Sequence, residues 1–329
     1  MAILVTGGAG YIGSHTVAEL LDRGEEVVVL DSLVTGHRES LLGGKLYVGD
    51  LRDKEILAKL FAENDIEAVI HFAASSLVGE SMKDPVKYYD NNVYGTQCLL
   101  EGMQKAGVDK IVFSSTAATY GEPEKVPIEE TDRTQPSNVY GETKLTMERM
   151  MSWFDKVLGI KYVALRYFNA AGAHASGKIG EDHRPESHLI PLVLQTALKQ
   201  RENIAVFGDD YPTEDGTCIR DYIHVSDLAD AHIRAVTYLR SGSGSNVFNL
   251  GNGLGFSVKE VIETAKEVTG LDIPVAIQER RAGDPAVLVA SSDKARSVLG
   301  WNPSRADLKE IIRSAWNWHS SHPQGYGEA

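Results

Sequence analysis

Near its start the chain reads Ile3-Leu4-Val5-Thr6-Gly7-Gly8-Ala9-Gly10-Tyr11-Ile12-Gly13, an apolar run that passes into a glycine-rich loop. A helical pattern follows, from Tyr11 to Asp22. Glycines permit a tight turn and let backbone N–H groups approach a pyrophosphate, whose charge the helix N-terminus stabilises. We therefore expect Gly7, Gly10 and Gly13 to bind the phosphates of a dinucleotide. The alternative is a turn that only joins a strand to a helix.

A carboxylate closes the second apolar run of the chain. Asp31 stands there, 18 residues after Gly13, where it can accept hydrogen bonds from the hydroxyls of an adenosine ribose. It would repel a 2′-phosphate, and the following Ser32-Leu33 offers no arginine to bind one. The sequence therefore predicts NAD as the cofactor, and not NADP. Asp50, at the end of the third run, is either a neighbour of the adenine or a turn residue.

The first half of the chain alternates β-branched runs with segments of helical period, which is typical of βαβ units and a parallel sheet. Strands are expected at 3–6, 26–30, 46–48, 68–72, 110–115 and 162–165. Helices are expected at 11–22, 54–63, 86–106 and 138–158. We predict an α/β fold with a Rossmann-type doubly wound parallel sheet.

This alternation stops after about Gly172, where a stretch rich in glycine, proline and acidic residues begins. A helix at 225–239 and a strand at 247–250 look like a return to the first pattern, and helices at 258–268 and 308–318 follow. We predict a cofactor-binding domain over residues 1–173, to which 221–250 return. Residues 174–220 and 251–329 would form a smaller C-terminal α/β domain for the substrate.

Composition excludes several classes of protein. The chain has 329 residues, 43% of them hydrophobic and 24% charged, which is ordinary for a globular protein. A net charge of -13 opposes binding to nucleic acid or to an anionic membrane. No apolar run is long enough to cross a bilayer, and the N-terminus lacks the pattern of a secretory signal, so we expect a cytoplasmic protein.

A tyrosine and a lysine stand four residues apart, Tyr140 and Lys144, in an expected helix. At this spacing both side chains lie on one helix face, so they can share a site. A neighbouring cation stabilises a phenolate, and so would the positive nicotinamide of NAD. Lowering a tyrosine pKa from about 10 to about 7 takes roughly 4 kcal/mol, which two cations in a partly dry pocket can supply. We expect Tyr140 to act as a general base. The spacing alone is weak evidence, because a solvated pair is common on helices.

Thr116 supports that hypothesis by its place in the chain. Ser114-Ser115-Thr116 ends the fifth strand, and the carboxyl ends of parallel strands form the ligand-binding edge of a doubly wound sheet. A hydroxyl there can bond a substrate oxygen beside the base. The alternative is a turn residue that bonds its own backbone.

Together with Arg166-Tyr167-Phe168-Asn169, these motifs resemble the extended short-chain dehydrogenase/reductases. Within that group the chain is similar to the UDP-glucose 4-epimerase family over nearly its whole length. The further motifs that carry this resemblance are segments 71–74, 78–81, 88–93, 211–217, 220–225 and 322–326.

The resemblance implies a reversible epimerisation of UDP-galactose and UDP-glucose through a transient 4-keto sugar. Tyr140 would take the proton of the 4-hydroxyl while the C4 hydride passes to tightly bound NAD, and the rotated ketone would receive the hydride on its other face. Lys144 would tune the tyrosine and hold the ribose, and Thr116 would bond the 4-oxygen.

The same resemblance assigns residues to the two ligands. The cofactor would contact Gly7, Gly10, Tyr11, Ile12, Gly13, Asp31, Ser32, Thr35, Gly36, Asp50, Leu51, Phe72, Ala73, Ala74, Asn91, Tyr140, Lys144, Tyr167 and Phe168. The UDP-sugar would contact Thr116, Tyr140, Asn169, His188, Leu189, Ala205, Val206, Phe207, Arg220, Arg281, Asp284 and Leu288. Apart from the resemblance, the guanidinium groups of Arg220 and Arg281 are chemically suited to bind a diphosphate through paired hydrogen bonds. Pairing of these arginines to Asp221 or Asp284 is the alternative.

Several positions depart from the family pattern. Ser76 stands where a cofactor-binding lysine is frequent, and His188 replaces a usual asparagine, although a neutral imidazole can still donate one hydrogen bond. Leu288 stands where some members carry a tyrosine that narrows the sugar pocket. We expect the smaller side chain to admit a 2-acetamido group, so that UDP-GlcNAc and UDP-GalNAc also turn over. Failure on UDP-GalNAc with activity on UDP-galactose would contradict this hypothesis.

Three rival functions remain. A nucleotide-sugar 4,6-dehydratase needs an extra acid and base, but Thr116 is followed by Ala117-Ala118 and carboxylates are missing there. A net dehydrogenase would need easy exchange of the cofactor, for which the sequence gives no sign. A silent NAD-binding protein is disfavoured by the intact Tyr140, Lys144 and Thr116. His183 and His188 lie five residues apart in a loop region, with no HExxH motif and no clustered carboxylate–histidine pair at metal spacing, so no catalytic metal is expected.

The helices expected at 86–106 and 138–158 carry many apolar residues. Either all of them face the sheet, or some face a second subunit. The resemblance implies a homodimer held by a four-helix interface.

Overall fold

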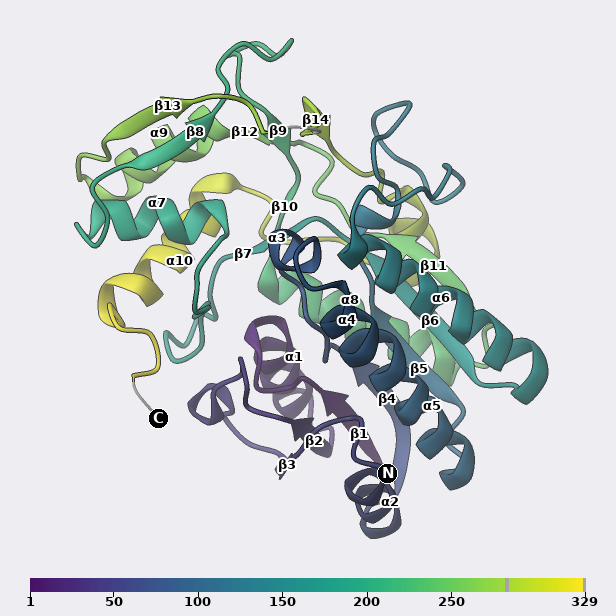
Figure 1. Ribbon diagram of the computed structural model, residues 1–329. Helices are drawn as coiled ribbons and strands as arrows, with labels where there is room; N and C mark the ends of the chain where they lie inside the picture. Colours follow the sequence, from purple (N-terminus) through teal and green to yellow (C-terminus); the bar gives the residue numbers. More distant parts are fainter. Residues whose placement is uncertain (282–283, 328–329) are drawn as a thin grey trace.

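The computed structural model describes residues 1–281 and 284–327 and is built on a seven-stranded parallel sheet with the order β11-β6-β5-β4-β1-β2-β3 (Figure 1). Its strands are β1 (Ala2–Thr6), β2 (Val27–Asp31), β3 (Lys45–Val48), β4 (Ile66–His71), β5 (Lys110–Ser114), β6 (Lys161–Arg166) and β11 (Asn246–Asn249). β1, β2 and most of β4 to β6 are buried, because helices cover both faces.

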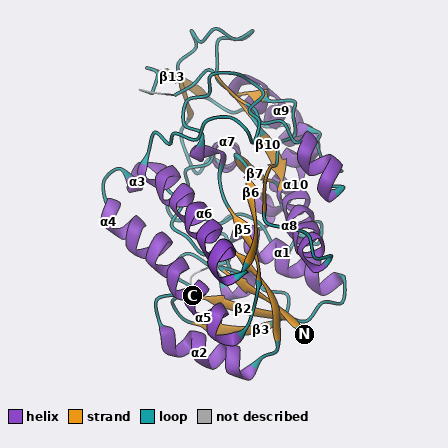
Figure 2. Ribbon diagram, turned by 90° about the vertical axis from the view of Figure 1, so that its right-hand side faces the viewer, coloured by secondary structure: helices purple, strands orange, loops and turns teal. Residues whose placement is uncertain are grey.

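Helices lie on both faces of this sheet (Figure 2). On one face lie α2 (Lys54–Glu63), α5 (Gly95–Ala106) and α6 (Val139–Leu158), whose apolar residues join those of one side of the strands in a single cluster. On the other face lie α1 (Tyr11–Asp22) and α8 (Val225–Arg240), with a second cluster. Helices α1 and α2 begin and end where the sequence predicts.

The strand order confirms the predicted doubly wound fold. β1 pairs in parallel with both β2 and β4, so the chain reverses its winding direction between β1 and β4. In such sheets ligands bind at the carboxyl ends of the strands beside this switch point. The loops after β1, β2, β4, β5 and β6 therefore form the edge on which a site is expected.

The single helix predicted over 86–106 is divided in the structure. A short helix α4 (Pro85–Tyr88) continues into a π-helical segment, Tyr89–Tyr94, and then into α5. The wider π-turn places Asn92 in the interior, where its side chain donates to the Ser75 carbonyl at 3.0 Å and to Thr143 Oγ1 at 3.1 Å. π-Turns within helices often occur at functional sites. Another helical turn, α3 (Val78–Ser81), precedes this region.

The remaining part of the chain packs at the carboxyl edge of the sheet around a third apolar cluster. It contains α7 (Leu189–Ala197), α9 (Val258–Thr269) and α10 (Leu308–Ser321), with β8 (Ile204–Phe207) paired to β13 (Val275–Gln278). Two smaller ladders join β7 (Asn169–Ala171) to β10 (Tyr222–His224), and β9 (Ile219–Arg220) to β12 (Phe256–Ser257) and β14 (Val287–Leu288). Most of these strands have only two to four residues, too few to show a period in the sequence.

Two elements late in the sequence lie against the first part of the molecule. β11 pairs in parallel with β6 at the edge of the large sheet, and α8 packs beside α1. Within the part of the chain that the structure describes, no helix combines the length and the apolarity that a bilayer crossing requires.

Candidate active site

The glycine loop after β1 packs so closely against neighbouring backbone that side chains at Gly7 and Gly13 would not fit. Gly7 has φ +70°, and a Cβ on it would lie 2.6 Å from the backbone nitrogen of Ala73. A Cβ on Gly13 would lie 2.1 Å from the Gly7 carbonyl oxygen. A Cβ on Gly10 would meet only that oxygen, at 3.3 Å, so Gly10 leaves open space at the start of α1. Tyr11 and Ile12 begin this helix, whose free N–H groups suit a pyrophosphate.

Asp31 closes β2 directly beside this loop. Its Oδ2 accepts from the Ala9 N–H at 2.9 Å and its Oδ1 from the Leu33 N–H at 2.8 Å. Burial raises the pKa of this carboxyl, and the two backbone donors oppose the shift. Gly36 packs against it, and the side chains of Ser32 and Thr35 are exposed beside it. A carboxylate fixed at this edge suits a ribose, so this loop and Asp31 fit NAD.

Asp50 acts as a turn residue in this structure. Its carboxylate accepts from the Arg52 N–H at 2.8 Å and forms an ion pair with the Arg52 guanidinium at 2.6 Å. Leu51 beside it is buried in the apolar cluster under α2 and α5. A contact of either residue with the adenine stays a prediction.

Tyr140, Lys144 and Thr116 meet where α6 passes the end of β5. Lys144 Nζ donates to the Ser114 carbonyl at 2.8 Å, and it lies 5.9 Å from the centre of the Tyr140 ring. The Thr116 side chain lies close enough to Tyr140 to oppose the rise of its pKa. Thr116 Oγ1 also accepts from the Ala118 N–H at 3.1 Å, so the turn role considered for it is present as well.

The electrostatics of this trio show how Tyr140 and Lys144 behave without the positive charge of the cofactor. Burial raises the pKa of Tyr140 to about 12, opposed only by the nearby side chain of Thr116. Burial lowers the pKa of Lys144 to about 7, opposed by the charge of Glu148. Lys144 alone therefore does not make Tyr140 a base in the ligand-free chain. Bringing Tyr140 from about 12 to about 7 takes about 7 kcal/mol, because each unit of pKa is worth about 1.4 kcal/mol.

Residues after β4 and in the π-helical segment border the same edge. Phe72, Ala73 and Ala74 follow β4, and Asn91 Nδ2 donates to Ser75 Oγ at 3.1 Å. Two residues that the sequence did not single out support them. Asn92 ties this loop to α6, and Ser81 Oγ accepts from the Tyr140 N–H at 3.1 Å. The adjacent amides of Asn91 and Asn92 indicated that this segment makes polar contacts. Which of the two side chains points into the protein depends on the π-turn, which the sequence did not predict.

Tyr167, Phe168 and Asn169 continue the edge after β6. The Tyr167 hydroxyl lies 2.5 Å from Ser114 Oγ, so its ring is fixed beside the strand that carries Thr116. Phe168 packs against the small cluster of Ala117, Tyr120 and Ile128, which Leu288 also contacts. Asn169 Nδ2 donates to the Asp221 carbonyl at 2.9 Å and joins β7 to β10.

The predicted diphosphate residues gather in the second part of the chain. Arg220 and Asp284 form an ion pair, which is the pairing considered as an alternative for this arginine. The Arg281 guanidinium instead lies 3.9 Å from the centre of the Phe207 ring. In β8, Ala205 and Phe207 are half-buried, whereas Val206 points into the apolar core. Val206 can therefore offer a ligand only its backbone.

His188 and Leu189 begin α7, but His188 is not the neutral imidazole that we expected. Its Nδ1 lies 2.8 Å from Glu181 Oε1 and 3.2 Å from Glu186 Oε1. These carboxylates outweigh the effect of burial and raise the pKa of His188 to about 10. The sequence reasoning did not connect His188 with either carboxylate. Leu189 packs on the third apolar cluster.

Comparisons with known proteins agree over the full length of the chain. Residues 3–251 match the model of the "NAD dependent epimerase/dehydratase family". A UDP-glucose 4-epimerase of Halalkalibacterium halodurans is 61% identical over 99% of this chain and 98% of the relative. A crystal structure of a UDP-glucose 4-epimerase superposes with a TM-score of 0.98 at 57% identity, covering 100% of both chains. The Bifidobacterium longum UDP-glucose 4-epimerase in complex with NAD+ and UDP superposes with a TM-score of 0.93 at 40% identity, covering 99% of this chain and 100% of that one.

Proposed function

This chain belongs to the NAD-dependent epimerase/dehydratase family, and we propose that it interconverts UDP-galactose and UDP-glucose by inverting C4 of the sugar. The observation that carries the proposal is the meeting of Tyr140, Lys144 and Thr116 at the end of β5. They stand at the same sheet edge as the glycine loop and Asp31. A proton-transfer group is thereby placed beside a cofactor site.

NAD is the cofactor of this enzyme. Gly7 and Gly13 allow the tight turn that brings the loop to the start of α1, where the free N–H groups suit its pyrophosphate, and Asp31 offers a carboxylate to its ribose. When bound, NAD accepts the hydrogen of C4 as a hydride and returns it.

The residues of the chain move the proton that accompanies this transfer. Tyr140 Oη takes the proton of the sugar 4-hydroxyl and gives it back when the opposite epimer forms. Thr116 holds the 4-oxygen next to Tyr140, beside which its side chain already lies. Lys144, fixed on the Ser114 carbonyl, stabilises the phenolate when it is charged. A phenolate in turn favours the ammonium form of Lys144, so the two ionisations support each other.

The second part of the chain binds the nucleotide sugar in this proposal. Residues 1–173 with 221–250 hold the cofactor, and 174–220 with 251–329 hold the uridine diphosphate. Arg220 and Arg281 supply the positive charge for the diphosphate, and the aromatic face of Phe207 lies next to Arg281. Asp284, which pairs with Arg220 without the ligand, keeps that guanidinium oriented.

The activity is tested directly with purified protein and UDP-galactose, without added NAD, followed by NMR. We expect UDP-glucose to appear until a fixed ratio of the two sugars is reached, because the cofactor stays bound through each cycle. A protein that leaves UDP-galactose unchanged, even after NAD is added, would contradict the proposal.

We also propose that N-acetylated UDP-sugars are accepted. Leu288 is half-buried and, like Phe168, packs against the small cluster of Ala117, Tyr120 and Ile128 just after β5, where a tyrosine would be larger. We expect Leu288→Tyr to lower turnover of UDP-GalNAc while turnover of UDP-galactose is kept. Equal turnover of UDP-GalNAc by both proteins, or no turnover by the wild type, would contradict this role.

We also propose that the protein is a homodimer and that it is located in the cytoplasm. Apolar side chains remain exposed on α4, on the π-helical segment and on α6, where a second subunit can cover them. Both cysteines, Cys98 and Cys218, are free and buried, which is usual in reducing compartments.

A further inference from the structure

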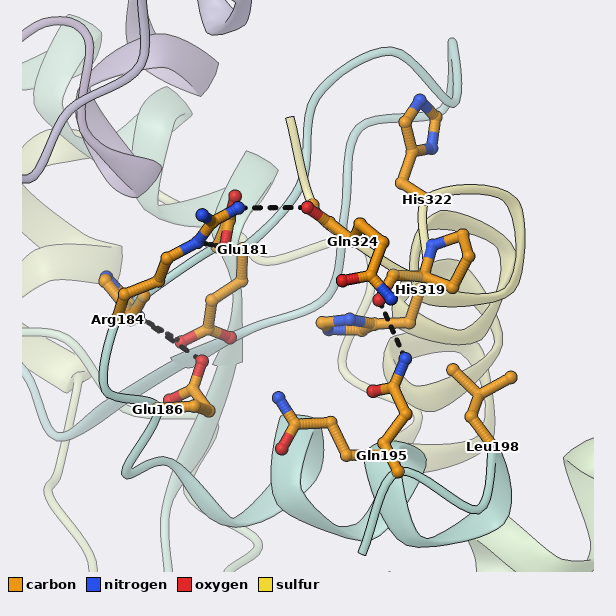
Figure 3. A pocket seen from close by; sticks show the side chains of 13 residues that line it. Glu181, Arg184, Glu186, Gln195, Leu198, His319, His322 and Gln324 are labelled. Carbon is orange, nitrogen blue, oxygen red and sulfur yellow. Dashed lines mark hydrogen bonds and ion pairs between the residues drawn. The ribbon is translucent and has the colours of Figure 1, made fainter. Parts of the chain in front are cut away.

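Four ligand-type side chains converge in the loop between β7 and α7. Glu181, His183, Glu186 and His188 each place one nitrogen or oxygen atom within 4.8 Å of the others. The carboxylates of Glu181 and Glu186 turn toward one another beside the cavity formed with α10 (Figure 3). We call these four residues the loop cluster. No described hydrogen bond or ion pair links it to Tyr140, Lys144 or Thr116.

Four nitrogen–oxygen distances in the loop cluster lie near the edge length of a coordination tetrahedron, with the two histidines facing different oxygens of Glu186. His188 Nδ1 lies 2.8 Å from Glu181 Oε1 and 3.2 Å from Glu186 Oε1. His183 Nδ1 lies 3.2 Å from Glu181 Oε1 and 3.6 Å from Glu186 Oε2. Ligands about 2.0–2.1 Å from a tetrahedral zinc ion are about 3.3 Å from each other. The atoms therefore already stand near the separations that one shared ion requires.

Hydrogen bonds account for only part of these contacts, since His188 Nδ1 is hydrogen-bonded to Glu186 Oε1 at 3.2 Å. Glu181 is only 4% exposed, yet its Oε1 has no hydrogen-bond partner, and neither has the buried His183 Nδ1. The two atoms lie 3.2 Å apart without the alignment of a hydrogen bond. A buried polar atom without a hydrogen bond is costly. A shared metal ion would give both atoms a partner.

We propose that the loop cluster binds one zinc ion with two imidazole nitrogens and two carboxylate oxygens. Two nitrogen donors favour zinc over magnesium or calcium, which prefer oxygen ligands. The two carboxylates neutralise the charge of a divalent ion in this buried place. Four protein ligands leave no open position, so the ion is structural and takes no part in the chemistry at Tyr140. From the sequence we expected no metal and no clustered carboxylate–histidine pair at metal spacing, and the loop cluster shows that the second expectation was wrong.

The ion would join parts of the chain that border both ligand sites. The Glu181 carbonyl accepts from Trp318 Nε1 of α10 at 3.2 Å. The His183 ring meets the Tyr11 ring edge-on at 6.1 Å, at the start of α1. Two backbone N–H groups, of Ser187 and His188, donate to Glu186 Oε1 at 2.7 and 2.8 Å and hold its carboxylate in place. Such outer contacts orient metal ligands.

The test measures zinc itself and does not use the epimerase activity, so it stands or fails apart from the proposed function. Full-length protein is stripped with a chelator and titrated with zinc against a chromophoric competitor, and its metal content is determined by mass spectrometry. We expect one zinc per chain. His183→Gln and Glu186→Gln should each weaken zinc binding by more than about 10-fold, since loss of an outer-sphere contact alone costs about 10–100-fold.

His174→Gln is the matched control, because His174 lies in the same loop and bonds Ser176 outside the loop cluster. It should bind zinc like the wild type. Circular dichroism confirms that each variant is folded, and cobalt in place of zinc should give the visible absorption of a tetrahedral site. A wild-type chain that binds no stoichiometric zinc would overturn the proposal, as would equal zinc affinity in folded His183→Gln and Glu186→Gln.

Discussion

The Tyr140 hydroxyl shows how burial and charge compete at a single residue. Two cations, Lys144 and the nicotinamide of NAD, were expected to make Tyr140 a base. In the chain without its cofactor, burial raises the pKa of Tyr140 and lowers that of Lys144. The further positive charge that Tyr140 needs therefore comes with the cofactor.

Removing the Tyr140 hydroxyl should abolish proton transfer with little change to the fold. For Tyr140→Phe we expect turnover of UDP-galactose to fall about 10²–10⁴-fold, the usual worth of a positioned acid–base group. The bound NAD content should stay the same, because the ring is kept. Tyr162→Phe, a variant of a tyrosine on β6 outside the trio, is the control for turnover. Activity of Tyr140→Phe within a few-fold of wild type would show that another group moves the proton.

Asp221 gives the stability of the protein a predictable dependence on pH. Its buried carboxylate accepts from the Asn252 N–H at 2.7 Å and the Ala290 N–H at 3.3 Å, but burial outweighs them and raises its pKa from 3.8 to about 6. The folded state therefore binds this proton more tightly than the unfolded chain. Stability contributed by the neutral form is present below about pH 4 and is lost as pH rises through about 6, by about 3 kcal/mol.

Urea unfolding at pH 4 to 6.5 tests this behaviour. The free energy of unfolding of Asp221→Asn should lack the fall that Asp221 causes in the wild type. Asp209→Asn, at an exposed position, should retain the wild-type slope. Parallel curves for wild type and Asp221→Asn would exclude Asp221 as the source.

Sequence spacing predicted those site residues whose geometry is local. Tyr140 and Lys144 share a helix face because they are four residues apart, and Asp31 follows from its distance to the glycine loop. Asn92, Ser81 and the loop cluster could not be found in this way. Their roles depend on a π-turn, on a contact between distant helices and on the path of an irregular loop, none of which has a period in the sequence.

At the scale of elements, the loop between β1 and α1 depends on the close approach of the loop after β4. Gly7→Ala would place a Cβ 2.6 Å from the Ala73 nitrogen in addition to a strained φ of +70°. Gly24 has a similar φ of +77° but open space around it, so Gly24→Ala measures the strain alone, about 1–2 kcal/mol. We expect Gly7→Ala to have the lower melting temperature and to lose bound NAD. Equal melting temperatures and NAD contents would show that the loop relaxes without cost.

Elements with a clear period were predicted well, and short ones were not. Helices α1 and α2 have the predicted bounds, since their apolar stripes are regular. Helix α7 was missed because apolar residues surround it and the preceding loop gives no cap signal: His188 makes no side-chain cap. The strands of the second part are held by pairing with distant segments, which local sequence does not encode.

At the scale of the whole molecule, both parts of the chain meet at the carboxyl edge of the large sheet. The strands end at this edge with the residues that we propose for the cofactor, and the second part, which carries the Arg220–Asp284 pair proposed for the diphosphate, packs across it. Residues 221–250 return from the second part to the first. Their strand β10 pairs with β7, and their helix α8 covers one face of the large sheet. The two ligand sites are therefore connected by continuous elements and not by a flexible linker.

We predict that the face formed by α4, the π-helical segment and α6 holds two copies of the chain together. Trp153 and Val157 of α6 are 64% and 71% exposed, and Val86 of the adjacent α4 is 76% exposed. These helices lie side by side (Figure 2), so two copies can bury them in a four-helix interface. By analytical ultracentrifugation we expect the wild type at twice the chain mass of 35.9 kDa and Trp153→Glu/Val157→Glu at the chain mass. Leu254→Glu, which changes an equally exposed leucine elsewhere, should remain a dimer, and a monomeric wild type would contradict the interface.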